Sequence, residues 1–338
     1  MMSDKPPKVS TDIDFDRPGK QVGHLIAPHS HDASAWGSLR VPFILVNGTA
    51  GSGKTILFTG GNHGDEYEGP IALLDLARNL DAAEVSGRVM IIPALNLPAV
   101  QNASRTSPID GGNMNRVFPG SRDGNLTEMI ADYLSRVLIP MSDAVIDIHS
   151  GGKTLDFWPA AVIHNLADAD LMARTKAAML AFGAPAGLII EELDAAGMLD
   201  TTVEDMGRVF VSTELGGGGT ARPENVALAK RGVQNMLKHF ELIVGKPEMP
   251  EVATRILHTP DAACFTAARE AGLYEAFIHV GDAVAPGQEI GQIHFFEHPQ
   301  RPPEIYTADV AGVLISRHFP GLARSGDCLA VIARDIAD

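Results

Sequence analysis

The residues best suited to chemistry begin with a histidine and a glutamate three positions apart, in the segment GGNHGDE. His63 and Glu66 follow an apolar run at 56–59 and precede a helix-like stretch at 68–80. At this spacing an imidazole and a carboxylate can reach one ion, either across a helical turn or from a tight loop. The pair alone is common by chance, and two solvated surface side chains would give the same pattern.

A histidine at the end of another apolar run supplies a third potential ligand. The segment AVIDIHSGG places His149 directly after residues 144–148, at the kind of strand end where α/β proteins gather their active-site loops. Two histidines and a carboxylate leave one position of a zinc ion open for water, which is the composition of a catalytic site. The alternatives are a histidine bonded only to backbone, or His164, which also ends a strand-like run.

A glutamate at a further strand end could move protons. Glu214 ends the run VFVSTE and is followed, after one leucine, by four glycines. A glutamate beside bound water can act as general base and then as acid toward a leaving nitrogen. A polar strand end in a glycine loop would look the same.

Two arginines and an asparagine form a cationic group in one loop region. Arg105, Asn115 and Arg116 lie in the segments QNASR and GNMNRVFPG, after another strand-like run. Such side chains could bind a carboxylate and stabilise an oxyanion. Ordinary solvated arginines are the alternative.

Short apolar runs alternate with helix-like stretches through most of the chain, which favours an α/β domain with a parallel or mixed sheet. The strand-like runs are 41–46, 56–59, 89–93, 144–148, 160–164, 188–190 and 209–213. The helix-like stretches are 68–80, 126–138, 168–182 and 224–240.

The pattern changes after the segment VGKPEMPE, where prolines end the helical periodicity. The rest of the chain consists of short β runs with a weak internal repeat, which suggests a small barrel similar to lipoyl domains. No lysine follows Lys246, so a carrier role is not expected. We therefore predict a flexible arm at 1–20, a catalytic α/β domain at 21–245 and a β-rich domain at 246–338.

Composition limits the partners. The charged residues, 27 Lys and Arg against 42 Asp and Glu, give a net charge of −15, which argues against binding nucleic acid or an anionic membrane. With only two cysteines, a disulfide framework is not expected. The sequence contains no apolar stretch of 18 residues, so a transmembrane helix is not expected either. The polar start shows no secretory signal, so a cytoplasmic protein is the expectation.

A phosphate-loop pattern occurs at 48–55, where GTAGSGKT fits GxxxxGK[ST]. This motif binds phosphate only when a helix begins at the lysine. Here Lys54 is followed by ILFTGG, which is β-rich and too short for a helix. We expect the turn of a β-hairpin joining 41–46 to 56–59, with a nucleotide-binding protein as the alternative.

The ordered set of candidates resembles the zinc carboxypeptidase-like superfamily and, more closely, the aspartoacylase/succinylglutamate desuccinylase family. The resemblance rests on the contexts GGNHGDE, NRVFPG and STELGGGG and covers nearly the whole chain. Within that family, DIHSGGKTLDFWP and STELGGGGT are similar to the Nα-acetyl-L-2,4-diaminobutyrate deacetylases of ectoine breakdown.

This resemblance implies a zinc-carboxypeptidase-like fold and a role for each candidate. One zinc ion per subunit would be held by His63, Glu66 and His149. Glu214 would be the general base and acid, and Arg105 would polarise the amide carbonyl. The α-carboxylate would be clamped by Asn115 and Arg116. The family also uses a tyrosine from the C-terminal region, and whether Tyr274 or Tyr306 takes this role is left open.

The implied reaction is zinc-dependent hydrolysis of a small N-acyl amino acid, with deacetylation of Nα-acetyl-L-2,4-diaminobutyrate as the favoured case. The side-chain ammonium of that substrate needs a carboxylate, and Asp156 and Glu68 are candidates from sequence proximity. Alternatives are an aspartoacylase-type or succinylglutamate desuccinylase-type deacylase and a carboxypeptidase-like peptidase. The sequence leaves a homo-oligomer open.

Overall fold

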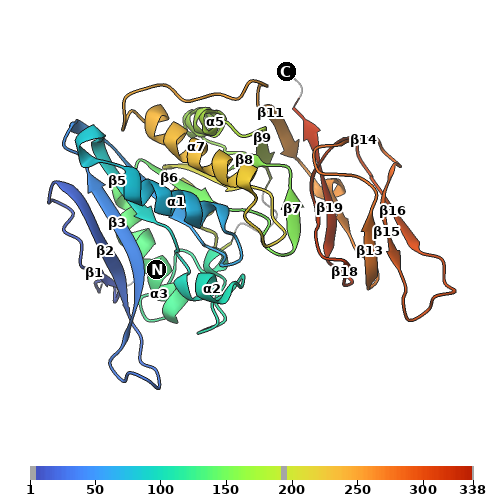
Figure 1. Ribbon diagram of the computed structural model, residues 1–338, viewed down its shortest axis with the longest axis horizontal. Coiled ribbons are helices and arrows are strands. Elements are labelled where there is room, and N and C mark those ends of the chain that lie inside the picture. Colours follow the sequence, from blue (N-terminus) through green and yellow to red (C-terminus); the bar gives the residue numbers. More distant parts are fainter. Residues whose placement is uncertain (1–4, 192–195, 337–338) are drawn as a thin grey trace.

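The computed structural model describes residues 5–191 and 196–336, which form a mixed α/β sheet followed by an all-β region (Figure 1). The strands of the first region are β1 (Ser10–Thr11), β2 (Gly19–Pro28), β3 (Ser38–Asn47), β4 (Gly51–Gly60), β5 (Ser86–Ile92), β6 (Ala144–Ile148), β7 (Leu155–Phe157), β8 (Ala160–His164), β9 (Ala186–Ile190), β10 (Val209–Glu214) and β11 (Arg255–Thr259). The helices are α1 (Glu68–Asn79), α2 (Leu97–Asn102), α3 (Leu126–Tyr133), α4 (Ile139–Met141), α5 (Ala169–Phe182), α6 (Leu199–Asp205) and α7 (Pro223–His239). A π-helical turn at Leu134–Leu138 joins α3 to α4.

The centre of the sheet is parallel: β5, β4, β6 and β10 are neighbours in that order. Alternate side chains of each strand enter different cores, because successive residues of a strand point to opposite faces. Ile56 and Phe58 of β4 pack in the core under α1, α5 and α7, whereas Leu57 packs in the core with α3. Figure 1 shows α1, α7 and α5 side by side over one face of the sheet.

The α/β prediction is confirmed, and most predicted elements occur near their expected positions. All seven predicted strands overlap β3, β4, β5, β6, β8, β9 and β10, and the four predicted helices overlap α1, α3, α5 and α7. The long strand β2 and the short elements β7, α2 and α6 were not predicted. Among the described residues, no helix is both long and apolar enough to cross a bilayer.

The flexible arm predicted at 1–20 is corrected for the described residues 5–20. Strand β1 pairs with β2 in antiparallel fashion, and the Thr11 hydroxyl donates to the backbone oxygen of His24 at 2.9 Å. Val9 and Ile13 are buried in the core that also contains α3. The burial of these two apolar side chains attaches the segment to the domain. The prediction of a flexible arm used the polar composition of the segment as a whole and so missed them.

The glycine-rich segment at 48–55 is not a phosphate loop, and it is not a simple hairpin turn either. Lys54 is an exposed residue within β4, and no helix begins there. The predicted hairpin is wrong because β5 lies between β3 and β4. A Cβ on Gly48 would lie 2.0 Å from the backbone oxygen of Val85, and one on Gly53 would lie 2.6 Å from that of Ser86, so close packing against the backbone where β5 begins explains both glycines.

The C-terminal region is all-β after β11. Its strands are β12 (Phe265–Ala267), β13 (Gly272–Ala276), β14 (Ala283–Val284), β15 (Glu289–His294), β16 (Glu304–Thr307), β17 (Gly312–His318), β18 (Leu322–Ala323) and β19 (Cys328–Asp335). One four-stranded sheet, in the order β16-β15-β13-β18, packs with β14, β17 and β19 around a separate core, and β12 pairs with β19. The likeness to lipoyl domains stays a prediction.

The main sheet continues across the boundary predicted at 245–246. Strand β11 pairs in parallel with β9 and antiparallel with β19, and β7 pairs with β17. A small apolar core also joins the two regions, since Leu188 of β9 packs with Leu257 of β11 and Val331 of β19. The predicted boundary marks the change from mixed α/β to all-β secondary structure, but strand pairing and apolar packing connect the two regions.

Candidate active site

His63 and Glu66 come from the loop between β4 and α1, not from within a helix. Gly61, with φ of 65°, turns the chain after β4. A Cβ on Gly64 would lie 1.9 Å from the backbone carbon of Ala99, so only glycine fits between the two candidate ligands. In this tight loop, Nδ1 of His63 lies 2.8 Å from Oε1 of Glu66.

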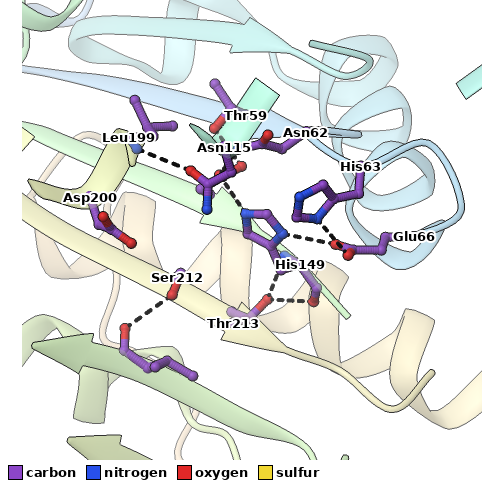
Figure 2. Close-up of polar contacts among 12 residues, drawn as sticks. Thr59, Asn62, His63, Glu66, Asn115, His149, Leu199, Asp200, Ser212 and Thr213 are labelled. Atoms are coloured by element: carbon purple, nitrogen blue, oxygen red, sulfur yellow. Dashed lines mark hydrogen bonds and ion pairs between the residues drawn. The ribbon is translucent and has the colours of Figure 1, made fainter. Parts of the chain in front are cut away.

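The parallel sheet brings His149 to the same place. Strand β6 lies beside β4, so the carboxyl ends of the two strands meet at one sheet edge. Nδ1 of His149 lies 2.8 Å from Oε2 of Glu66. Figure 2 marks this contact with a dashed line. The candidate ligand atoms of His63, Glu66 and His149 all lie within 4.8 Å of one another, and all three residues are buried.

Each imidazole is oriented by an oxygen on its other nitrogen. Nε2 of His149 lies 2.7 Å from Oδ2 of Asp147, and Nε2 of His63 lies 3.2 Å from Oδ1 of Asn113. An acceptor at Nε2 keeps the proton there, so that Nδ1 of each ring is the nitrogen available to a cation. Two imidazoles and one carboxylate with such supporting groups fit a zinc ion.

Buried charges shift the pKa values of this group. Burial acts to raise the pKa of Glu66, but His63 and His149 together lower it far below its usual range. Burial acts to lower the pKa of His149, but the carboxylates of Asp147 and Glu66 raise it well above its usual range. The two carboxylates thus favour a positive charge at this position, whether it is a protonated imidazole or a bound metal ion.

Glu214 reaches the same sheet edge from β10, the other parallel neighbour of β6. The backbone N–H of the next residue, Leu215, donates to the backbone oxygen of His149 at 3.1 Å, which joins the two strand ends. Burial and the negative charge of Glu66 raise the pKa of Glu214 to about 8. Within the part of the chain that the structure describes, its buried Oε2 accepts no hydrogen bond.

A cavity of about 230 Å³ opens beside these residues and brings the predicted set together. It is lined by His63, Glu66, Arg105, Asn115, Arg116, His149 and Glu214, together with apolar side chains. The guanidinium of Arg105 is half-exposed, and its Nη1 lies 3.7 Å from Oε1 of Glu66. Arg105 is therefore placed to contact a group bound beside the three candidate ligands.

Asn115 and Arg116 belong to a short 3₁₀ turn on the same cavity wall. The backbone N–H of Leu199 donates to Oδ1 of Asn115 at 3.0 Å, which connects this turn to the start of α6. Nη1 of Arg116 donates to the backbone oxygen of Asn115 at 2.7 Å. These bonds hold an amide and a guanidinium at the cavity, as binding a carboxylate requires.

The structure corrects the prediction that Asp156 or Glu68 meets a substrate ammonium. Asp156 is 3% exposed, its Oδ1 accepts from Arg222 at 2.8 Å, and its Oδ2 lies 3.5 Å from Arg317. On β7 it is the neighbours Leu155 and Phe157 that line the cavity, because side chains alternate along a strand. Glu68 is fully buried at the start of α1 and is not among the described residues that line the cavity, and burial raises its pKa to about 7.

Sequence reasoning missed three polar residues of the site. Asp147 had a usable signal, because residues two apart on a strand share a face, and His149 is two positions on. Asn113 and Asp200 had none, since they lie in a loop and in a helix too short to predict.

The two C-terminal tyrosines left open by the resemblance lie elsewhere. The ring of Tyr274 packs edge-on against His318, and the hydroxyl of Tyr306 accepts from the backbone N–H of Arg269 at 3.0 Å. Neither is among the described residues that line the cavity.

Sequence comparisons show which known proteins this chain is similar to. Residues 52–240 match the family model of the succinylglutamate desuccinylase/aspartoacylase catalytic domain. An N-alpha-acetyl-L-2,4-diaminobutyric acid deacetylase from Halomonas elongata is 47% identical over 97% of this chain and 96% of that protein.

Two solved structures are similar to this chain over nearly its whole length. The product-bound ectoine utilization protein EutE (DoeB) from Ruegeria pomeroyi is 48% identical, with a TM-score of 0.95 over 98% of this chain and 99% of that chain. A succinylglutamate desuccinylase from a Silicibacter species is 46% identical, with a TM-score of 0.93 over 98% of this chain and 100% of that chain.

Proposed function

Since this chain belongs to the succinylglutamate desuccinylase/aspartoacylase family, whose members hydrolyse N-acyl amino acids, we propose that it is a zinc-dependent deacetylase of Nα-acetyl-L-2,4-diaminobutyrate. The products would be acetate and diaminobutyrate, in the breakdown of ectoine. The observation that carries this proposal is the buried group of His63, Glu66 and His149 facing one cavity with Glu214. The high identity to a diaminobutyric acid deacetylase supports the choice of substrate.

The metal would be held by Nδ1 of His63, Nδ1 of His149 and the carboxylate of Glu66. When bound there, zinc supplies Lewis acidity for the scissile carbonyl and makes water more acidic. Asp147 and Asn113 keep the Nε2 protons of the two rings in place, so that neither ring has to change tautomer during the reaction.

Glu214 would carry the proton through the reaction. The pKa of Glu214 is raised to about 8, and a cation held beside Glu66 would lower it toward neutrality. A carboxylate whose pKa lies near the working pH can take a proton from the attacking water and give it to the leaving nitrogen, because neither proton transfer is then strongly uphill in free energy. No covalent intermediate between enzyme and acyl group is needed.

The cationic side chains would position the substrate. Arg105 lies beside Glu66 and would stabilise the negative charge that develops on the carbonyl oxygen. Asn115 and Arg116, on the same cavity wall, would bind the α-carboxylate. With its carbonyl held by Arg105 and its α-carboxylate by Asn115 and Arg116, the substrate would have its amide fixed between Glu214 and the three candidate ligands.

The proposal is tested by product release from a panel of substrates. Acetate is measured from Nα-acetyl-diaminobutyrate and N-acetylaspartate, succinate from N-succinylglutamate, and free amino acid from a dipeptide with a free carboxyl end. We expect the highest kcat/KM with Nα-acetyl-diaminobutyrate and loss of activity in Glu214→Gln. Activity confined to N-acetylaspartate, the succinyl compound or the dipeptide would overturn the substrate. A cytoplasmic location and a homo-oligomer stay predictions.

A further inference from the structure

Arg105 depends on its backbone for its place in the site. Within the part of the chain that the structure describes, its guanidinium donates no hydrogen bond, and its Nη1 lies 3.7 Å from Oε1 of Glu66. A half-exposed arginine side chain has several rotamers, so the position of its backbone decides which places the guanidinium can reach. The role of Arg105 at the carbonyl oxygen therefore requires that the surrounding segment is held firmly.

This segment turns at an unusual residue. Ala103, directly after α2, has φ of 50°, in the left-handed region that a residue with a Cβ rarely adopts. The next residue is bonded on both sides: the Ser104 hydroxyl donates to the backbone oxygen of Thr106 at 2.8 Å, and the backbone N–H of Gly64 donates to the backbone oxygen of Ser104 at 2.9 Å. A left-handed alanine persists only where its surroundings hold it in place.

The ammonium of Lys153 provides one such contact from a distant part of the chain. Its Nζ donates to the backbone oxygen of Ala103 at 2.5 Å, across 50 positions of sequence. This oxygen belongs to the left-handed residue itself, and a charged donor makes the stronger kind of hydrogen bond. Exposed lysines are ordinarily solvated, so a short bond to this particular carbonyl sets Lys153 apart.

The rest of Lys153 is attached to the loops that carry the other candidate residues. Its backbone N–H donates at 2.9 Å to Oδ2 of Asp65, in the loop between β4 and α1. Its stem lies against the glycines that follow Glu214, since a Cβ on Gly219 would lie 2.8 Å from Cγ of Lys153. One residue thus connects the segment of Arg105 to the loops of the candidate ligands and of Glu214.

We propose that Lys153 is a positioning residue, which holds the Ala103 carbonyl and so fixes the segment from which Arg105 reaches the substrate carbonyl oxygen. Lys153 is not among the described residues that line the cavity, so it acts through Arg105 and not by touching the substrate. The inference rests on the proposed function, which gives Arg105 a role but does not say what holds it in place.

The first test is kinetic. Lys153→Met keeps most of the stem and removes the ammonium. With Nα-acetyl-diaminobutyrate we expect kcat to fall about 10-fold and KM to change by less than about 3-fold, because Arg105 acts in the transition state. Lys153→Arg keeps a charged donor and should recover most of kcat. Lys246→Met, at an exposed lysine outside the site, is the matched control and should leave both constants unchanged. An unchanged kcat in Lys153→Met, with or without a rise in KM, would overturn the proposal.

A double-mutant cycle separates positioning of Arg105 from a general structural role. Arg105→Ala should lower kcat about 100-fold, the usual cost of losing one oxyanion donor. In that background Lys153→Met should lower kcat by less than about 2-fold, because the group that it positions is gone. A loss of about 10-fold in both backgrounds would instead show a role that does not pass through Arg105, and would overturn the proposal.

Trypsin tests the segment without any turnover. Since proteolysis requires local opening of the chain, Lys153→Met should raise the rate of cleavage after Arg105 about 10-fold, measured by mass spectrometry, whereas Lys246→Met should not. Equal rates would contradict the hold of Lys153 on this segment. If Lys153→Met does not fold, Lys153→Gln takes its place with the same expectation, because its amide ends one atom short of the lysine nitrogen. If the unmodified enzyme deacylates no substrate of the panel, the proposed function fails, and the cleavage rates still test the hold of Lys153 separately.

Discussion

Asp147→Asn should weaken zinc binding without dismantling the site. Asp147 is fully buried, and its Oδ2 lies 2.7 Å from Nε2 of His149 and accepts from Nδ2 of Asn62 at 2.9 Å. Its Oδ1 accepts from the Thr59 hydroxyl at 2.7 Å. An asparagine can keep its oxygen on His149 and turn its amide nitrogen toward Thr59, because a hydroxyl also accepts. The change therefore removes mainly a negative charge.

The size of the effect follows from the role of Asp147 behind a ligand. Loss of such a supporting carboxylate costs about 10 to 100-fold in metal affinity, or ~1.4 to 2.8 kcal/mol. We expect the upper end, because the Asp147 carboxylate is buried at contact distance from the ring and helps to raise the pKa of His149. Its loss makes the ring a weaker base and a weaker ligand.

The assay is competition for zinc between the protein and a chromophoric chelator, with thermal unfolding of the metal-free protein as a check on folding. Asp156→Asn is the control, because it also neutralises a buried carboxylate, but one paired with Arg222 and Arg317. An Asp147→Asn protein that folds and binds zinc as tightly as the unmodified chain would refute the assigned role of Asp147.

Four further predictions follow from the same geometry. Glu214→Gln should lower kcat by at least about 100-fold while zinc content, measured by atomic absorption, is retained; loss of the zinc would instead make this residue a ligand. Zinc binding at pH 7 should release about one to two protons, because the raised pKa values of His149 and Glu214 favour their protonated forms and a cation displaces these protons. The affinity for zinc should then rise with pH. Calorimetry in buffers of different ionisation enthalpy measures the number of protons released. Gly64→Ala should destabilise the fold by about 1 to 3 kcal/mol, because the added Cβ would overlap the backbone of Ala99. Gly321→Ala is the control, because its Cβ would meet open space. Equal melting temperatures of the two variants would contradict this prediction. Lys54→Ala should leave activity unchanged, and ATP with magnesium should not raise the melting temperature of the unmodified protein; stabilisation by ATP that this variant abolishes would revive the phosphate loop.

Much of the central sheet could be predicted because its strands are continuous apolar runs. Residues 144–148 and 160–164 are buried at every position, as expected for strands covered on both faces. The order of the strands could not be read from the chain, because nothing local shows that β5 lies between β3 and β4. The attachment of β1 depends on tertiary burial of Val9, which local composition does not show.

The meeting of the candidate ligands could be predicted because each one ends or follows a parallel strand at the centre of the sheet. His149 and Glu214 then meet at one edge by topology, without any local sequence signal that joins them. The prediction that Asp156 meets the substrate was wrong because its nearness to His149 in sequence does not determine toward which face of β7 its side chain points. Asp200 lies far from the other candidates in sequence, and only the folded chain brings it to the cavity.

The most direct test of the central claim is anomalous diffraction at the zinc absorption edge from crystals of the protein grown with zinc. We predict one anomalous peak per chain, bound by Nδ1 of His63, Nδ1 of His149 and the carboxylate of Glu66. A zinc ion held by other residues, or no peak at this place in an enzyme that still releases acetate, would contradict the account.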